Sequence, residues 1–218
     1  VNDAVPAGAT AGGVGESWTW VGSNPSPYAG ALAHQSGLVG GLHQLYFYAA
    51  TVTLAVGVGD SLFAYVYLDP ANPPREVMLQ WNDGTWDHRA YWGENLIPWG
   101  TDGSASRLYM GALPATGQWV RLEVTAAQVG LAGRTVNGMA YTLYDGRATW
   151  DYAGKAAAAA LPTYQVSGTV MVGATALGGV SFAASGGVSC SNSNGAGQYA
   201  CTVPQGWSGS VTPALSGY

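Results

Sequence analysis

The chain has 218 residues, of which only 9% are charged and 48% are hydrophobic; its formal net charge is −5, and it contains 33 glycines and 11 prolines. So much glycine and proline excludes a mainly helical protein, and the hydrophobic content excludes simple disorder. The seven basic residues form no patch, so a nucleic acid is not an expected partner, and no run of about 20 apolar residues predicts a membrane span.

The first 155 residues contain one short strand pattern after another. Residues 61–68 alternate with apolar or aromatic side chains on both faces, as in the middle of a sandwich, and 76–81 and 86–92 flank the hairpin turn Asn82-Asp83-Gly84. Only 126–130 has any helical character. Further strands are expected at 45–56, 107–113, 118–125, 137–144 and 148–151. Short strands separated by turns predict a jelly-roll β-sandwich over residues 1–155.

A linker is expected at 156–163, where five alanines and Pro162 offer no amphipathic face. Strand patterns at 164–172, 180–184, 197–203 and 209–213 then predict a second, small β domain over 164–218, which could be an incomplete sheet with an open edge. Cys190 and Cys201 flank Asn194-Gly195, a hairpin turn sequence that would bring the two sulfurs together. A disulfide is therefore predicted, with two free thiols as the alternative.

Charge is distributed very unevenly along the chain. Residues 156–218 contain no Asp, Glu, Lys, Arg or His, whereas an average domain has about a quarter of its residues charged. This favours a surface that a neighbouring module, another subunit or a cell-wall matrix covers; the alternative is a secreted module hydrated by hydroxyl groups. The disulfide and the start at Val1 rather than Met are expected of a processed or excerpted secreted or cell-surface protein.

The first domain resembles a module of bacterial surface proteins. The resemblance rests on FAYVYLDPANPPREVMLQWNDGTWDHRAYWG (63–93) and continues through WGTDG (99–103), WVRLEV (119–124) and MAYTLYDGRATWD (139–151). Such modules occur beside Rhs/YD-repeat proteins and in other exported polypeptides, and the resemblance implies a carbohydrate-binding-like jelly roll with no fixed ligand or catalytic role. The tail, from VSGTV (166–170) to VPQGWSG (203–209), is similar to immunoglobulin-like or carboxypeptidase-regulatory-like repeats of adhesins, which implies an immunoglobulin-like or prealbumin-like sandwich.

Eight of the nine tryptophans precede the linker. Aromatic faces can stack on the apolar C–H faces of sugars, although core packing also claims tryptophans. Trp81 and Trp119 lie in alternating apolar strands and are expected in the core. The residues expected to be partly exposed and to contact a glycan are grouped around the 76–92 hairpin: Trp86, Trp92, Trp99 and Tyr91, with Gln80, His88 and Arg89 as hydrogen-bonding partners. A structural cation–π pair is the alternative role for Arg89.

Catalytic and metal chemistry find little support. Glu76, Asp83 and Asp87 are close in sequence, but Asp83 lies in a turn, so a glycoside hydrolase is not expected and no cofactor is required. His34, His43 and His88 lack zinc-ligand spacing. Calcium is favoured over zinc, as a structural ion held by Asp3 and Asp151 with backbone carbonyls where the first and last strands of a jelly roll are neighbours; the alternative is solvation at strand ends.

The sequence thus favours a non-catalytic extracellular structural or adhesive protein of a bacterial surface or fibre, which associates with itself or with neighbouring modules by β-sandwich packing and strand pairing. The alternative is a carbohydrate-binding module that recognises glycans through an aromatic platform.

Overall fold

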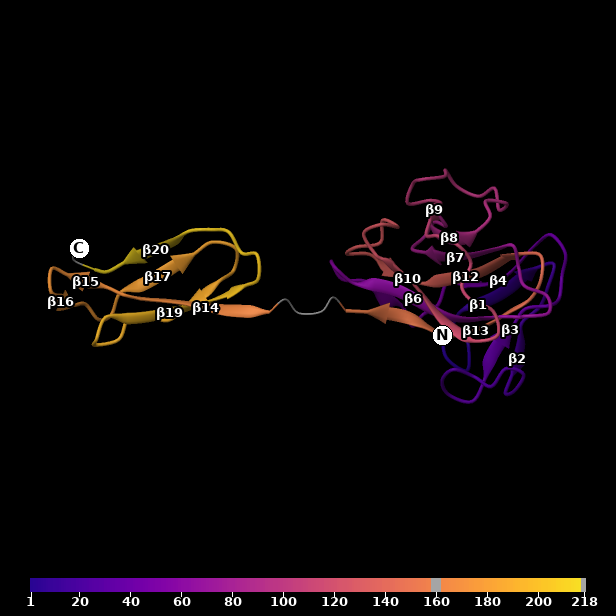
Figure 1. Ribbon diagram of the computed structural model, residues 1–218, viewed down its shortest axis with the longest axis horizontal. Helices are drawn as coiled ribbons and strands as arrows, with labels where there is room; N and C mark the ends of the chain where they lie inside the picture. Colours follow the sequence, from indigo (N-terminus) through magenta and orange to yellow (C-terminus); the bar gives the residue numbers. More distant parts are fainter. Residues whose placement is uncertain (158–161, 217–218) are drawn as a thin grey trace. The chain divides into compact units, whose positions relative to one another are not determined.

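A computed structural model describes residues 1–157 and 162–216 of the chain. These residues form β-strands, turns and loops and no α-helix, which confirms the all-β prediction. In the part of the chain that the structure describes, no helix is long and apolar enough to cross a membrane. The chain divides into two compact units, Val1–Ala158 and Ala159–Tyr218, each of which is described separately (Figure 1).

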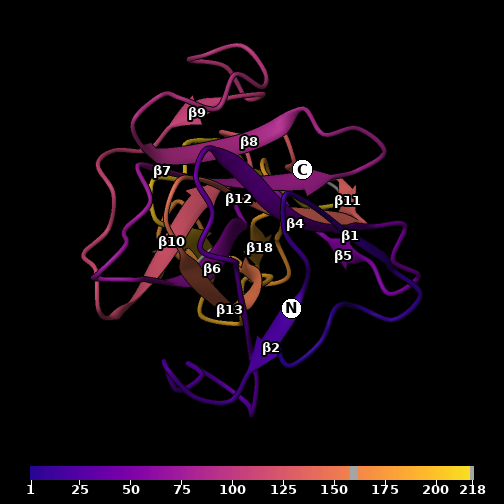
Figure 2. The ribbon, with the colours of Figure 1, turned by 90° about the vertical axis from the view of Figure 1, so that its right-hand side faces the viewer.

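The first unit is a sandwich of two sheets (Figure 2). The larger sheet has six strands, antiparallel except for the parallel pair β8–β9. In spatial order they are β1 (Thr10–Val14), β4 (Leu42–Tyr48), β12 (Gly138–Tyr144), β7 (Glu76–Asn82), β8 (His88–Gly93) and β9 (Leu108–Tyr109).

The second sheet of this unit has five antiparallel strands. In spatial order they are β10 (Trp119–Thr125), β6 (Ser61–Leu68), β13 (Ala148–Ala156), β3 (Ala33–Gln35) and β2 (Thr19–Val21). A two-stranded ladder of β5 (Leu54–Ala55) and β11 (Thr135–Val136) completes the unit.

The core lies between the two sheets and follows from strand alternation. In β6, Leu62, Ala64, Val66 and Leu68 are fully buried, while the intervening aromatic residues occupy the outer face. Burying each large side chain of this kind contributes about 1.5–3 kcal/mol. The predicted core position of Trp81 is confirmed, whereas Trp119 is half-buried on the outer face beside Tyr67, because its strand parity places it there.

Several predicted strands differ from the observed ones. The expected strand 45–56 ends at Tyr48, because Ala49 adopts φ 55° and leaves the extended conformation; β5 is a separate strand. Of 107–113 only β9 forms, and 126–130 forms turns. Strand β13 continues to Ala156, where it pairs with Ser61, so the sheet includes the first residue of the expected linker; 158–161 lie outside the described residues.

The described residues of the second unit form three small antiparallel sheets. The longest has the order β14–β19–β18, so β14 is an edge strand. Expected strand 164–172 is divided between β14 and β15. The bounds are β14 (Thr163–Thr169), β15 (Met171–Val172), β16 (Thr175–Ala176), β17 (Ser181–Ala184), β18 (Ser189–Cys190), β19 (Gln198–Pro204) and β20 (Val211–Ala214).

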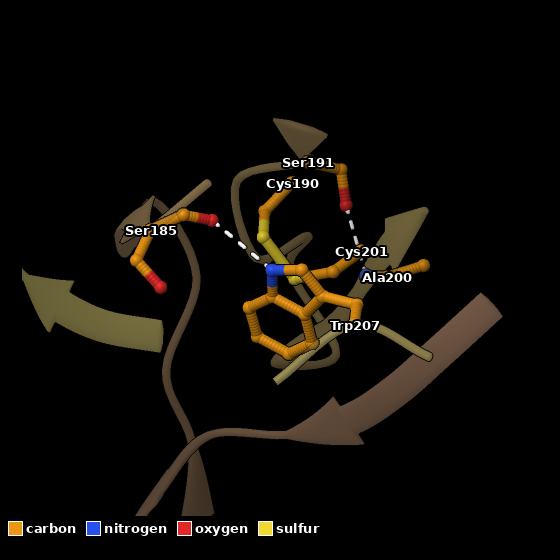
Figure 3. Close-up of a disulfide and its surroundings, with 6 residues drawn as sticks. All are labelled: Ser185, Cys190, Ser191, Ala200, Cys201 and Trp207. Atoms are coloured by element: carbon orange, nitrogen blue, oxygen red, sulfur yellow. Dashed lines mark hydrogen bonds between the residues drawn. A yellow bond between two sulfur atoms is a disulfide. The ribbon is translucent and has the colours of Figure 1, made fainter. Parts of the chain in front are cut away.

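The predicted disulfide between Cys190 and Cys201 is present, and the two cysteines are directly opposite each other in the β18–β19 pair (Figure 3). The turn itself differs from the expectation. Asn194 occupies its first position rather than a central one, since its carbonyl accepts the N–H of Gly197 and its side chain accepts two further N–H groups. Gly197 has φ 74°, a conformation that glycine adopts readily.

Candidate functional site

A pocket of about 430 Å³ lies on the outer face of the six-stranded sheet of the first unit. Its volume is within the range of small-ligand sites. Strands β1, β4, β7 and β8 and the loops 83–87 and 94–107 supply its walls. The lining residues are Val14, Gln44, Tyr46, Tyr48, Gln80, Trp86, Arg89 and Trp99.

The floor of the pocket is one row of cross-strand neighbours. Gly12 pairs with Tyr46, Tyr46 with Ala140, Ala140 with Gln80, and Gln80 with Arg89. Directly paired residues point to the same face of a sheet. Ala140 is the small residue between Tyr46 and Gln80, so its larger neighbours rise above it and the row is not flat.

Polar side chains on the floor form a continuous hydrogen-bond network. The Arg89 Nε donates to Gln80 Oε1 at 2.8 Å. The amide nitrogen of Gln80 donates to Thr142 Oγ1 at 2.7 Å and to Gln44 Oε1 at 3.1 Å. The Thr142 hydroxyl also donates to Gln44 Oε1, at 3.1 Å. Four strands are thereby linked through side chains whose positions are mutually determined.

Aromatic rings stand around this polar floor. Tyr46 lies over Gly12, where an added Cβ would come within 2.7 Å of the ring, so the close approach requires glycine. Trp86 meets the Tyr46 ring edge-on, at 6.4 Å between centroids and 80° between planes. Trp86 and Trp99 are both half-buried, and they enter from different loops.

The loop that carries Trp86 is anchored by Asp83. Its carboxylate accepts hydrogen bonds from His88 Nε2 at 3.0 Å and Arg134 Nη1 at 2.7 Å. Burial would raise the pKa of Asp83, but these two partners outweigh it and hold the pKa below the ordinary value. His88 also contacts the Val129 carbonyl through Nδ1 at 2.6 Å. The expected glycan contact of His88 is therefore wrong, because both ring nitrogens have structural partners on the core side of β8.

The loop that carries Trp99 is anchored by two buried side chains. Glu76 is fully buried and accepts the N–H groups of Leu96 and Ile97 at 2.5 and 2.8 Å. Arg89 Nη1 donates to the Ser106 carbonyl at 3.0 Å. Gly100 has φ 80°, and a Cβ there would lie 2.9 Å from Arg89 Nη1, so the loop packs closely on the guanidinium. Glu76 thus serves as an anchor of the loop.

Two residues expected to be exposed at the site are buried. Trp92 is 8% exposed and belongs to the core between the sheets, on the same face of β8 as Ala90. Tyr91 points to the outer face but is only 3% exposed, since residues 94–107 cover it. Its hydroxyl donates to Asp102 at 2.9 Å, and burial raises its pKa to about 12. Period-two alternation explains the error for Trp92, because adjacent strand residues cannot share a face, whereas the covering loop explains it for Tyr91.

Of the residues predicted for the site, Gln80, Trp86, Arg89 and Trp99 meet at the pocket. The prediction missed Val14, Gln44, Tyr46 and Tyr48, which come from β1 and β4. Alternation in β4 could have signalled them, since Gln44, Tyr46 and Tyr48 share one face and the buried residues of that strand share the other. Nothing in that segment shows that it lies two strands from Gln80.

The calcium site expected at Asp3 and Asp151 stays a prediction, and the structure shows both carboxylates bonded to backbone N–H groups. Asp3 Oδ1 accepts the N–H groups of Ala31 and Leu32, and Asp151 accepts those of Ala29 and Tyr152. Both carboxylates therefore hold the loop before β3 and a bend of β13 by backbone hydrogen bonds. Within residues 1–157 and 162–216, no group of three or more His, Cys, Asp or Glu side chains could hold a metal ion.

The sequence matches no protein-family model and no curated protein. Among solved structures, it is similar to carbohydrate-binding modules of the β-sandwich superfamily (10% identity, 71% of this chain and 58% of that chain, TM-score 0.42). It is also similar to the glycoside hydrolase domain of Endo-D from Streptococcus pneumoniae (13%, 80% and 25%, 0.42) and to a family 11 carbohydrate-binding module from Clostridium thermocellum in complex with a mixed-linked tetrasaccharide (9%, 73% and 94%, 0.36). The chain thus spans less than two thirds of the first two proteins, and at these scores no ligand or activity transfers to it.

Proposed function

We propose that the first unit binds a carbohydrate at the outer face of its six-stranded sheet, without catalysing a reaction on it. The observation that carries this proposal is the combination of half-buried aromatic rings, among them Trp86 and Trp99, with a connected polar floor in one pocket. Sugars present an apolar C–H face and a rim of hydroxyls. Aromatic rings suit the first, while amide and guanidinium groups suit the second.

Binding without catalysis is favoured because two of the three candidate carboxylates for hydrolysis, Glu76 and Asp83, are engaged in hydrogen bonds that hold loops in place. Glu76 is engaged with two backbone N–H groups, and Asp83 with His88 and Arg134. Asp87 lies at the rim, 3.5 Å from Arg89. A pair of carboxylates facing each other across the pocket, as glycoside hydrolysis uses, would require a different arrangement.

The test is a glycan screen of the whole protein, followed by calorimetry with each hit. Trp86→Ala should weaken binding about tenfold or more, because the stacking surface is removed. Trp119→Ala is the matched control, since Trp119 lies on the opposite sheet and its indole bonds to the Ser26 carbonyl. Equal loss in both variants, or no binding of any glycan by the folded protein, would refute the proposal.

Assembly through the second unit is a second candidate function, and the edge strand β14 favours it. The strand contains no charged residue and no proline, and Tyr164 and Val166 are 55% and 50% exposed. Natural edge strands usually carry charges or proline that prevent pairing with another chain. The expected role is a structural or adhesive one outside the cell, where a disulfide persists.

Association by strand pairing should be concentration-dependent and should survive high salt, because uncharged contacts are not screened. Electron microscopy, together with mass determination in solution, would measure this association. Val166→Lys should abolish association. Thr202→Lys is the control and should leave association unchanged, because Thr202 is an exposed residue of the central strand β19, which has no free edge. Dispersed monomers of the unmodified protein at high concentration would exclude this second role.

A further inference from the structure

The charge of the pocket is unusual for a site in so acidic a chain. Arg89 is the one charged residue that lines it, in a protein of formal net charge −5. The residue is only 8% exposed. A guanidinium at this depth is costly unless other groups compensate its charge.

Compensation of Arg89 by the described residues is incomplete. Nε and Nη1 donate to the neutral oxygens of Gln80 and Ser106. The nearest carboxylate, Asp87, lies 3.5 Å from Nη1 on a side chain that is 71% exposed. An exposed partner at that distance compensates the buried charge only in part. Among the described residues, Nη2 has no hydrogen-bond partner, and it is not a fully enclosed atom, so its two N–H groups are free to meet a ligand.

A second cation reinforces this local charge. Burial lowers the pKa of Arg89, Asp87 raises it in part, and Arg107 is close enough to lower it by a smaller amount. The acidic groups of the neighbouring loop are occupied: Glu76 by Leu96 and Ile97, and Asp102 by Tyr91, Asn95 and, more distantly, Arg107. Arg89 is thus the only charged group among the residues that line the pocket, and aromatic rings stand around it.

We propose that the pocket prefers a glycan that carries a carboxylate, a sugar acid such as a uronic acid, which Arg89 binds through Nη2. The inference rests on the carbohydrate-binding function proposed above. A single acidic sugar in an otherwise neutral oligosaccharide fits this pocket better than a densely charged polyanion does. The net negative charge of the protein would repel a polyanion. For a single carboxylate, salt at physiological concentration screens charges more than about 8 Å away, while the short contact with Arg89 remains.

A matched pair of ligands tests this preference. The probes are oligosaccharides that end in one glucuronic or galacturonic acid, and the same oligosaccharides after reduction of the carboxyl to a hydroxymethyl group. Calorimetry with the full chain should show binding of the acid about tenfold tighter than of its reduced counterpart, because hydrogen bonds to charged groups are the stronger ones. The preference should shrink in 1 M salt if the contact is partly exposed.

Asp87→Asn keeps the test independent of folding, because Asp87 is exposed and anchors no loop. Removing its carboxylate removes the competitor for Arg89, so affinity for the acid should rise about twofold to fivefold while affinity for the reduced sugar stays the same. Arg89→Lys should lose most of the preference, since an ammonium cannot reproduce the planar guanidinium. Arg121→Lys, on the opposite sheet, is the matched control, because it makes the same substitution away from the pocket.

The outcomes separate this inference from the function on which it rests. Equal or tighter binding of the reduced oligosaccharide would overturn the acid preference and leave carbohydrate binding intact. Acid binding that survives Trp86→Ala would place the contact outside this pocket and would also overturn the inference. An unchanged acid preference in Asp87→Asn would contradict the electrostatic role of Arg89. If neither acidic nor neutral glycans bind, the proposed function itself fails.

Discussion

The first unit buries a continuous core between two sheets, whereas the described part of the second unit contains only three buried apolar residues, Val180, Cys201 and Val203. In the second unit, an aromatic pair and side-chain hydrogen bonds add to the small apolar core. Phe182 stacks on Tyr199 at 4.1 Å, and Ser193 is buried with its hydroxyl bonded to the Leu177 carbonyl and the Val180 N–H. A unit of this size cannot bury enough apolar surface alone, so a covalent cross-link becomes important.

Charge separates the two units just as sharply. The first unit contains ion pairs such as Arg147–Asp69, Arg134–Asp83 and Lys155–Asp60. Residues 156–218 contain no Asp, Glu, Lys, Arg or His at all. The comparison teaches that two β units of one chain can respond to different variables: the first to pH, the second to reduction of its disulfide.

The largest expected effect is acid destabilisation of the first unit through His34. This ring is 1% exposed among Trp18, Trp20 and Tyr141, and neither nitrogen has a hydrogen-bond partner. Burial lowers its pKa from 6.5 to about 3. As the pH falls below 6.5 the unfolded state takes up a proton that the folded state refuses, so the unit should lose about 4 kcal/mol between pH 7 and pH 3.

Carboxylates of the first unit add to this loss at lower pH. For Asp69, burial would raise the pKa, but the Ala71 N–H and Arg147 outweigh it and hold the pKa below the ordinary value. A carboxyl group whose pKa is lowered by folding stabilises the folded unit above about pH 4. This stabilisation is lost as the pH falls through the pKa of the folded state. Hydrogen exchange resolved by unit would measure both effects. The second unit should be unaffected from pH 3 to 8, and His34→Phe should remove most of the change above pH 4; a parallel decline of both units would contradict this account.

Loss of the disulfide should have the next largest effect, and on the other unit. Cys190 and Cys201 are separated by 11 positions, and closing a loop of that length contributes about 3 kcal/mol in the chain-entropy description. Cys190→Ala with Cys201→Ala should therefore unfold the second unit at a temperature where the first unit remains folded. Reductant added to the unmodified protein should reproduce the result. Equal protection of the second unit with and without the cross-link would show that its small core suffices.

A smaller effect is expected at Trp207. Its indole N–H donates to the Ser185 carbonyl, a bond drawn in Figure 3. The bond is 3.2 Å long, and an added Cβ at Gly186 would lie 3.2 Å from the same nitrogen. Trp207→Phe keeps an aromatic ring but removes this bond between two loops, and should cost the second unit about 1 kcal/mol. Chemical denaturation in oxidising buffer would measure it. An unchanged midpoint would mean that water replaces the bond at no cost.

The pocket of the first unit illustrates how far sequence reasoning reached. The hairpin of β7 and β8 was predictable, because two alternating segments flank a turn sequence and contact each other locally. Its residues were nevertheless assigned to one surface together, and alternation divides them: Arg89 faces the pocket, while His88 and Trp92 face the core. Applying the period of two strictly would have removed these two residues from the site.

The sequence by itself determined the all-β class, the local hairpins, the disulfide and the division of charge between the two units, since each depends on composition or on residues close together in the chain. Only the tertiary structure decided which residues share the pocket. Gln44 and Gln80 come together because β4 and β7 both pair with β12. Residues 138–144 of β12 lie far along the sequence from residues 76–82 of β7. Pairing between such distant strands depends on packing of the whole sandwich, and no local pattern in the sequence specifies it.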